Sequence, residues 1–217
     1  MRDRLSDLRP PKRGGELCLG RNMIMRLEMP VELAAAYKSP SQRARIISEA
    51  WGSSNLYCPR CDSPRVEAST ANTQAVDFVC PRCTAAFQLK SQAHEFSRRV
   101  TDAAYEVMRR AIEESRTPHL LTLHYDSASW SVRNLTLIPS FALTLSCLEK
   151  RKPLAPTARR KGWVGCNILL FNIPRDARIA MISDGRPASP GSSEASTTVC
   201  SHLRGLNSKA AAGLLTC

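Results

Sequence analysis

Two Cys-x-x-Cys pairs constrain the fold of this chain more than any other feature of its sequence. Cys58 pairs with Cys61 and Cys80 with Cys83, and a proline follows the first cysteine of each pair. Zn²⁺ favours four thiolates in a tetrahedron, and a two-residue gap allows each pair to hold the ion from one tight turn. Proline preshapes such a turn. The spacing therefore predicts a structural zinc knot over residues 58–83, in preference to buried free thiols or disulfides.

The remaining cysteines indicate a reducing compartment. They are scattered along the chain without the spacing of a metal site, which is typical of thiols that stay free. No apolar run of signal-peptide length follows the basic N-terminus, and no stretch reaches the ~20 apolar residues that span a bilayer. We therefore expect a cytoplasmic protein with free thiols at Cys18, Cys147, Cys166, Cys200 and Cys217.

The charge balance predicts a polyanionic partner. Lys and Arg number 31 against 19 Asp and Glu, which gives a formal net charge of +12 and a pI near 9.7. Nucleic acid is the commonest polyanion for so basic a chain, although a solubilising surface charge is the alternative. Aromatic residues make up 6% of the sequence, so a duplex gripped by its phosphates fits better than single strands stacked on rings.

Composition divides the chain into three parts. Residues 1–22 predict a flexible basic arm, residues 23–182 hold the sustained hydrophobic patterns, and residues 183–217 form an irregular tail rich in Ser, Ala, Gly and Thr. The middle part predicts an α/β (α+β) domain with a mixed sheet. We expect helices over 43–51, ended by Gly52, over 94–115 and, shorter, over 141–148. The expected strands cover 119–125, 130–138 and 168–171, beside a hairpin through Phe78 and Phe87.

A second pattern, interleaved with the cysteines, predicts metal-dependent chemistry on a phosphate. Asp77 precedes the second cysteine pair, and Gln88, Leu89 and Lys90 follow it. The Asp77 carboxylate, the Gln88 amide oxygen and the Leu89 carbonyl are oxygen ligands of the kind that Mg²⁺ prefers. The Lys90 ammonium shares a strand face with Gln88 and can stabilise charge that develops on a phosphodiester. Taken alone, the pattern also fits a solvated strand face.

Five segments give this pattern a context. They are residues 44–51 (ARIISEAW), 55–61 (NLYCPRC), 76–83 (VDFVCPRC), 87–91 (FQLKS) and 162–168 (GWVGCNI). As a set they resemble the Dam-replacing, or DpnI, family of restriction endonucleases over roughly residues 30–182.

The resemblance implies a PD-(D/E)xK nuclease core with a four-Cys zinc-binding insertion. It implies a type II, Mg²⁺-dependent cut of double-stranded DNA at GATC sites whose adenine is methylated. Asp77, Gln88 and Lys90 then take the positions of the catalytic Asp, the second acidic ligand and the Lys.

Two departures from the family pattern affect the expected activity. Gln88 carries an amide where the motif usually has a carboxylate, and an amide holds a cation less strongly. Residues 183–217 stand where family members usually continue into a winged-helix domain, and their composition does not resemble one.

Further residues are candidates for supporting roles. Glu49, on the helix before the zinc segment, is a candidate to support the metal site, and an exposed charge is the alternative. Arg159, Arg160 and Lys161 are candidates for contacts with DNA phosphates, and a solvated loop is the alternative.

Two other functions compete with an active nuclease. The first is a zinc-containing DNA-binding module that is catalytically weak or inactive, with Gln88 as the sign of decay. The second is a zinc-stabilised protein-interaction domain, which the net positive charge disfavours.

Overall fold

The computed structural model describes residues 25–61, 63–70 and 75–187. The basic arm expected over residues 1–22 lies outside the described residues. So does the expected tail, apart from residues 183–187, which continue the sheet.

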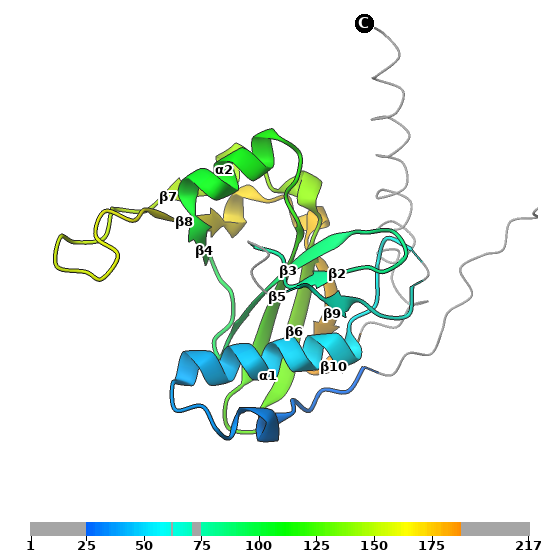
Figure 1. Cartoon of the computed structure of the whole chain (residues 1–217). Coiled ribbons are helices and arrows are strands. Elements are labelled where there is room, and N and C mark those ends of the chain that lie inside the picture. The colour runs from blue at the N-terminus through cyan, green and yellow to red at the C-terminus, as the bar shows by residue number, and fades with distance from the viewer. Residues whose placement is uncertain (1–24, 62, 71–74, 188–217) are drawn as a thin grey trace, which may run out of the picture.

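A seven-stranded mixed sheet forms the centre of the molecule (Figure 1). β3 and β5 pair in parallel, whereas the other neighbours pair antiparallel. This confirms the expectation of a mixed α/β architecture with a mixed sheet. In spatial order the strands are β1 (Glu67–Ala68), β2 (Phe78–Val79), β3 (Ala86–Gln92), β5 (His119–Asp126), β6 (Ser131–Ile138), β9 (Ile179–Ser183) and β10 (Arg186–Pro187).

A smaller antiparallel sheet lies on one side of the central sheet. Its strands, in spatial order, are β4 (Arg99–Ala104), β8 (Gly165–Leu169) and β7 (Leu148–Lys150). Helix α2 (Tyr105–Glu113) follows β4 directly, and it lies with this sheet at the top of Figure 1, across the central strands from α1.

The helix expected over residues 94–115 is wrong in its first half. Residues 99–104 form β4, and the helix begins at Tyr105. Val100 and Asp102 are buried and alternate with exposed neighbours, as in a strand. The pairing of Val100 with Ile168 of β8 supplies the backbone partners and the apolar contact that a helical period in the sequence does not reveal.

Other boundaries differ by a few residues. The expected helix over 141–148 consists of two 3₁₀ turns, η2 (Ser140–Ala142) and η3 (Leu145–Cys147). β8 ends at Leu169, so Phe171 lies in the turn η4 (Leu170–Asn172) and is exposed. Two further 3₁₀ turns are η1 (Val31–Ala34) and η5 (Arg175–Ala177).

Helix α1 (Pro40–Asn55) runs past the expected stop at Gly52. It covers the other face of the central sheet, with Ile47 and Trp51 fully buried. Gly52 lies inside the helix, and its missing side chain makes room for the buried ring of Phe78 on β2. A Cβ at this position would lie 2.6 Å from Phe78 Cζ.

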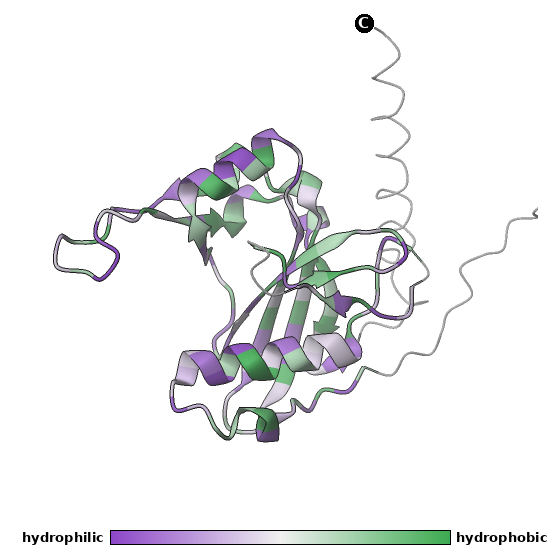
Figure 2. Cartoon of the chain, viewed as in Figure 1, coloured by the Kyte–Doolittle hydropathy of each residue, from purple (hydrophilic) through white to green (hydrophobic). Residues whose placement is uncertain are grey.

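The two faces of the central sheet bury separate cores. On the α1 side, Phe87 and Leu89 of β3 pack in the same cluster as Leu121 of β5. On the other side, Leu120 of β5 packs with Val100 of β4. Figure 2 shows hydrophobic residues along the central strands and hydrophilic residues along the loop between β7 and β8. Because side chains alternate along β3, its even-numbered residues face the small sheet.

Substitution of Gly52 by Ala tests the packing of α1. Alanine normally stabilises a helix relative to glycine by up to about 1 kcal/mol, but here overpacking against Phe78 should cost about 1–3 kcal/mol. We therefore expect Gly52→Ala to lower the urea midpoint, while the exposed control Ser54→Ala leaves it unchanged or slightly raised. A Gly52→Ala chain as stable as the parent would contradict the contact.

Candidate functional site

The four predicted cysteines meet in one cluster. Cys58 and Cys61 follow α1, whereas Cys80 and Cys83 lie in the turn between β2 and β3. The Sγ atoms of Cys58 and Cys83 are 3.6 Å apart, those of Cys61 and Cys80 are 3.5 Å apart, and all four lie within 4.8 Å of one another. A tetrahedron of sulfurs at the usual Zn–S distance has edges of about 3.8 Å. The cluster is therefore able to hold a metal ion and fits zinc.

The surroundings of these thiols shift their pKa values in different directions. Burial raises the pKa of Cys58 and of Cys61. Burial also acts to raise the pKa of Cys80, but the N–H groups of Cys83 and Arg82 outweigh it and lower that pKa to about 6. Four thiolates at neutral pH therefore need a cation to balance their charge.

The cluster joins α1 to the hairpin that carries the other candidate residues. The turn is closed by Cys80 N donating to Ala85 O (2.9 Å) and Thr84 N donating to Cys80 O (3.0 Å). Phe78 pairs with Phe87 on the strands that follow. A metal held by both cysteine pairs would thus fix the start of β3 against the end of α1.

Asp77 lies at the open edge of β3. Its N–H donates to Phe87 O (2.9 Å), and its Oδ2 accepts from Leu89 N–H (2.7 Å). Burial is the main influence and raises the pKa of Asp77. The charge of Glu49 raises it further, whereas the Leu89 N–H and the charge of Lys90 lower it. The carboxylate is therefore close to both neighbouring charges.

Gln88 and Lys90 project from the opposite face of β3 to Leu89 and meet a third residue, Asp102. Gln88 Nε2 donates to Asp102 Oδ1 at 2.9 Å, and Lys90 Nζ lies 2.5 Å from the same oxygen. The Asp102 side chain is fully buried, and the Lys90 side chain is 25% exposed. Within the part of the chain that the structure describes, Asp102 Oδ2 has no hydrogen-bond partner.

Sequence reasoning did not identify Asp102. The helical period assigned it to the solvated face of the helix expected over 94–115, whereas β4 directs it into the protein. One local signal was available, because the β-branched pair Val100 and Thr101 favours a strand. The longer apolar period of the residues that form α2 outweighs this signal.

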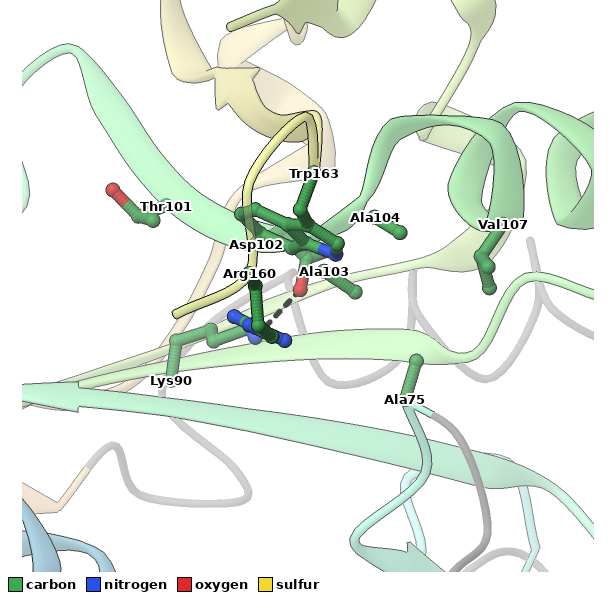
Figure 3. Close-up of a pocket in the computed structure, with 9 residues that line it drawn as sticks. All are labelled: Ala75, Lys90, Thr101, Asp102, Ala103, Ala104, Val107, Arg160 and Trp163. Carbon is green, nitrogen blue, oxygen red and sulfur yellow. Dashed lines mark ion pairs between the residues drawn. The ribbon is translucent and has the colours of Figure 1, made fainter. Parts of the chain in front are cut away.

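A cavity of about 450 Å³ opens beside the Lys90–Asp102 ion pair (Figure 3). Trp163 and Val107 contribute to its apolar wall. The Arg160 guanidinium lies over the Trp163 ring, 4.4 Å from its centroid, and also lines the cavity. The loop that carries this pair therefore reaches the side chains of β3.

The loop between β7 and β8 carries the other basic candidates. Arg159, Arg160 and Lys161 are exposed, and the loop projects from the body of the molecule (Figure 1). Arg159 lines a separate hollow with Leu154. The structure thus places Arg160 beside the cavity at Lys90 and the other two residues nearby on the same loop.

Glu49 lies on α1 and forms an ion pair with Arg45 at 2.6 Å. Its charge raises the pKa of Asp77, so the two carboxylates are within electrostatic reach. A role in supporting a metal site remains a prediction.

Comparison with known protein families matches residues 25–196 to the Dam-replacing family, DpnI. The match covers the cysteine cluster, β3, β4 and the basic loop. Among the described residues, no helix has both the length and the apolar character to cross a membrane.

Removal of one cysteine ligand tests the metal cluster. We expect about one zinc per chain in the parent, and loss of that zinc in Cys61→Ser. The melting temperature should fall by about 10 °C or more. A lost zinc site removes several kcal/mol of unfolding free energy, and each kcal/mol lowers the melting temperature of a chain of this size by ~2–4 °C.

The control for this experiment is Cys147→Ser, in a buried cysteine of the other core. It should retain the zinc whatever its effect on stability, as measured by metal analysis of the folded protein. A zinc-free parent that is fully folded would overturn the assignment.

Proposed function

Because this chain belongs to the Dam-replacing family of restriction-type nucleases, we propose that it cleaves double-stranded DNA at GATC sites whose adenine is methylated. The observation that carries the proposal is that the Asp77 carboxylate is bound to the backbone of β3 at Leu89, between Gln88 and Lys90, and that Lys90 borders a cavity also lined by Arg160 of the basic loop. In this proposal the central sheet is a PD-(D/E)xK core, and the cysteine cluster is a structural zinc insertion.

The donor set at β3 suits Mg²⁺. Oδ2 of Asp77 accepts from Leu89 N–H, which leaves Oδ1 to bind a cation. Nε2 of Gln88 is bonded to Asp102, which leaves the amide oxygen. In an extended strand the N–H and C=O of one residue point to the same edge, so the Leu89 carbonyl shares the edge that Asp77 occupies. Three oxygen donors of the kind that Mg²⁺ prefers are therefore available.

The chain's own residues supply the rest of the chemistry. When bound, Mg²⁺ supplies Lewis-acid activation of the phosphate. Lys90, held in place by its ion pair with Asp102, stabilises the negative charge that develops on the phosphate oxygens during attack by water. The water oxygen bonds to phosphorus, the bond to the 3′ or 5′ oxygen breaks, and that oxygen leaves as a hydroxyl that carries the proton lost by the water.

In this proposal the basic loop between β7 and β8 provides contacts with the DNA phosphates. Arg159, Arg160 and Lys161 are exposed, and Arg160 borders the cavity at Lys90. Contacts of such residues with phosphates give affinity and set the position of the duplex without reading its sequence.

A catalytically weak DNA-binding module is the second candidate. The observation that favours it is that Lys90 and Gln88 are both engaged by Asp102. This function predicts DNA binding without Mg²⁺-dependent cutting.

Cleavage of plasmid DNA in Mg²⁺ separates the two candidates. We expect the parent to cut adenine-methylated plasmid and to spare the unmethylated plasmid. Lys90→Ala and Asp77→Ala should each lower the rate by about 100-fold or more, as loss of a group that stabilises the transition state does, while DNA binding persists. The control Lys38→Ala removes an exposed lysine that lies just before α1 and should cut at the parental rate.

Each outcome of this experiment has a defined meaning. Equal cutting of methylated and unmethylated plasmid would contradict the methylation requirement. A Lys90→Ala chain that cuts as fast as the parent would show that the site is assigned to the wrong residues.

Charge removal from the basic loop tests the proposed grip. The triple substitution of Arg159, Arg160 and Lys161 by Ala should weaken duplex binding and reduce the slope of log K against log salt by up to about 3, at ~0.9 for each phosphate contact. A control triple removes the same charge from exposed positions elsewhere, at Lys38, Arg133 and Arg175. Equal slopes for the two triples, measured by fluorescence anisotropy across a salt series, would show that the loop has no special role.

A further inference from the structure

The buried Asp102 explains why an amide can stand at position 88. Asp102 Oδ1 is 2.9 Å from Gln88 Nε2 and 2.5 Å from Lys90 Nζ, so one oxygen accepts from both donors. The two donors come from the same face of β3, and the acceptor comes from β4 in the other sheet. This contact joins two strands that are not paired with each other.

We infer that Asp102 is a positioning residue that supplies the negative charge missing at position 88, turns the Gln88 amide oxygen toward the cation and holds the Lys90 side chain beside it. The inference rests on the proposed function, because it concerns the same site.

The orientation of the Gln88 amide follows from its bond to Asp102. The oxygen and nitrogen of an amide diverge from one carbon, so an Nε2 bonded to Asp102 turns Oε1 away from it. A flipped amide would instead place Oε1 against the carboxylate, where two acceptors repel each other. Asp102 therefore keeps the atom that can bind a cation free to do so.

The same geometry opposes a carboxylate at position 88. Gln88 is 4% exposed and the Asp102 side chain is fully buried. A Glu at this position would place a second carboxylate beside Asp102, with Lys90 as the one ammonium shared between them. Two buried carboxylates side by side repel each other, and that repulsion opposes a Glu at this position.

This reverses the expectation from the motif alone. The motif suggests that Gln88→Glu, by restoring the usual carboxylate, should lower the Mg²⁺ concentration required. Because the Asp102 carboxylate already lies against this position, the new carboxylate should instead weaken cation binding. The gain in cation binding expected from a carboxylate at position 88 should appear only when Asp102 is replaced by the neutral, isosteric Asn.

A double-mutant cycle tests the inference without any need for catalysis. The variants are Gln88→Glu, Asp102→Asn and the two combined, each as zinc-loaded protein. The probe is Ca²⁺, measured by calorimetric titration, because Ca²⁺ also favours oxygen ligands. We expect each single change to weaken Ca²⁺ binding by about tenfold, and the combined change to restore it to within about threefold of the parent, as coupled neighbours do.

The physical reasons differ between the two single changes. Asp102→Asn leaves Lys90 without its anion, and the unbalanced ammonium repels the cation. Gln88→Glu adds a charge that Asp102 opposes. In the combined variant the carboxylate introduced at position 88 can pair with Lys90 and bind the cation, while the amide introduced at position 102 can donate to that carboxylate.

A matched control keeps the chemistry of the substitution constant. Gln92→Glu makes the same change on the same face of β3, where the side chain bonds to the His94 and Glu95 carbonyls and not to Asp102. Its Ca²⁺ affinity should stay within about threefold of the parent. Melting temperatures of all variants identify any that lose affinity by unfolding, which a purely structural role for Asp102 would predict.

The outcomes separate this inference from the proposed function. Tighter Ca²⁺ binding in Gln88→Glu with Asp102 intact, or single effects that simply add, would overturn the inference even if the parent cuts DNA. A parent that binds no divalent cation would also overturn it. The two substitutions could prove coupled in their effect on Ca²⁺ binding while the parent cuts no methylated DNA. That result would support the role of Asp102 and contradict the nuclease proposal.

Discussion

The alternation of side chains along β3 determines where the core ends and where the candidate site begins. Phe87 and Leu89 face α1 and join the larger core, whereas Gln88 and Lys90 face the small sheet. The parallel pairing with β5 keeps this register, since a slip of one residue would exchange the two sets. The polar pair is tolerated at this depth because Asp102 satisfies it from β4.

The parts of the fold that sequence reasoning found are those set by local rules. The four cysteines could be assigned because a two-residue gap is a requirement of the turn that binds the metal, and the structure brings their Sγ atoms within 4.8 Å. The strands β5 and β6 carry long apolar and β-branched runs, which predict strands whatever they pair with. Asp77, Gln88 and Lys90 stand out as candidates for the same local reason, because their motif is short and continuous with the second cysteine pair, and their catalytic role stays a prediction.

The parts that were missed depend on partners far along the chain. Residues 99–104 are a strand because β8, which comes much later in the sequence, offers them an edge. Gly52 looked like a helix end, but α1 continues through it, and the glycine instead allows the Phe78 ring to pack closely against the helix. Asp102 could not be selected, because its two partners, Gln88 and Lys90, lie on another strand, and the sequence around Asp102 contains no pattern that indicates them. In each case a tertiary contact decides between local structures that propensity leaves nearly equal.

We propose that Asp77, Gln88 and the Leu89 carbonyl form one cation site at the edge of β3. The most direct test is anomalous diffraction from crystals of the zinc-loaded chain soaked in Mn²⁺, a cation that favours the same oxygen ligands as Mg²⁺. We expect a Mn²⁺ peak bound by these three oxygens, with Asp102 still bonded to Gln88 Nε2. A Mn²⁺ peak bound elsewhere, with Gln88 and Lys90 still closed on Asp102 and no cation at Asp77, would contradict it.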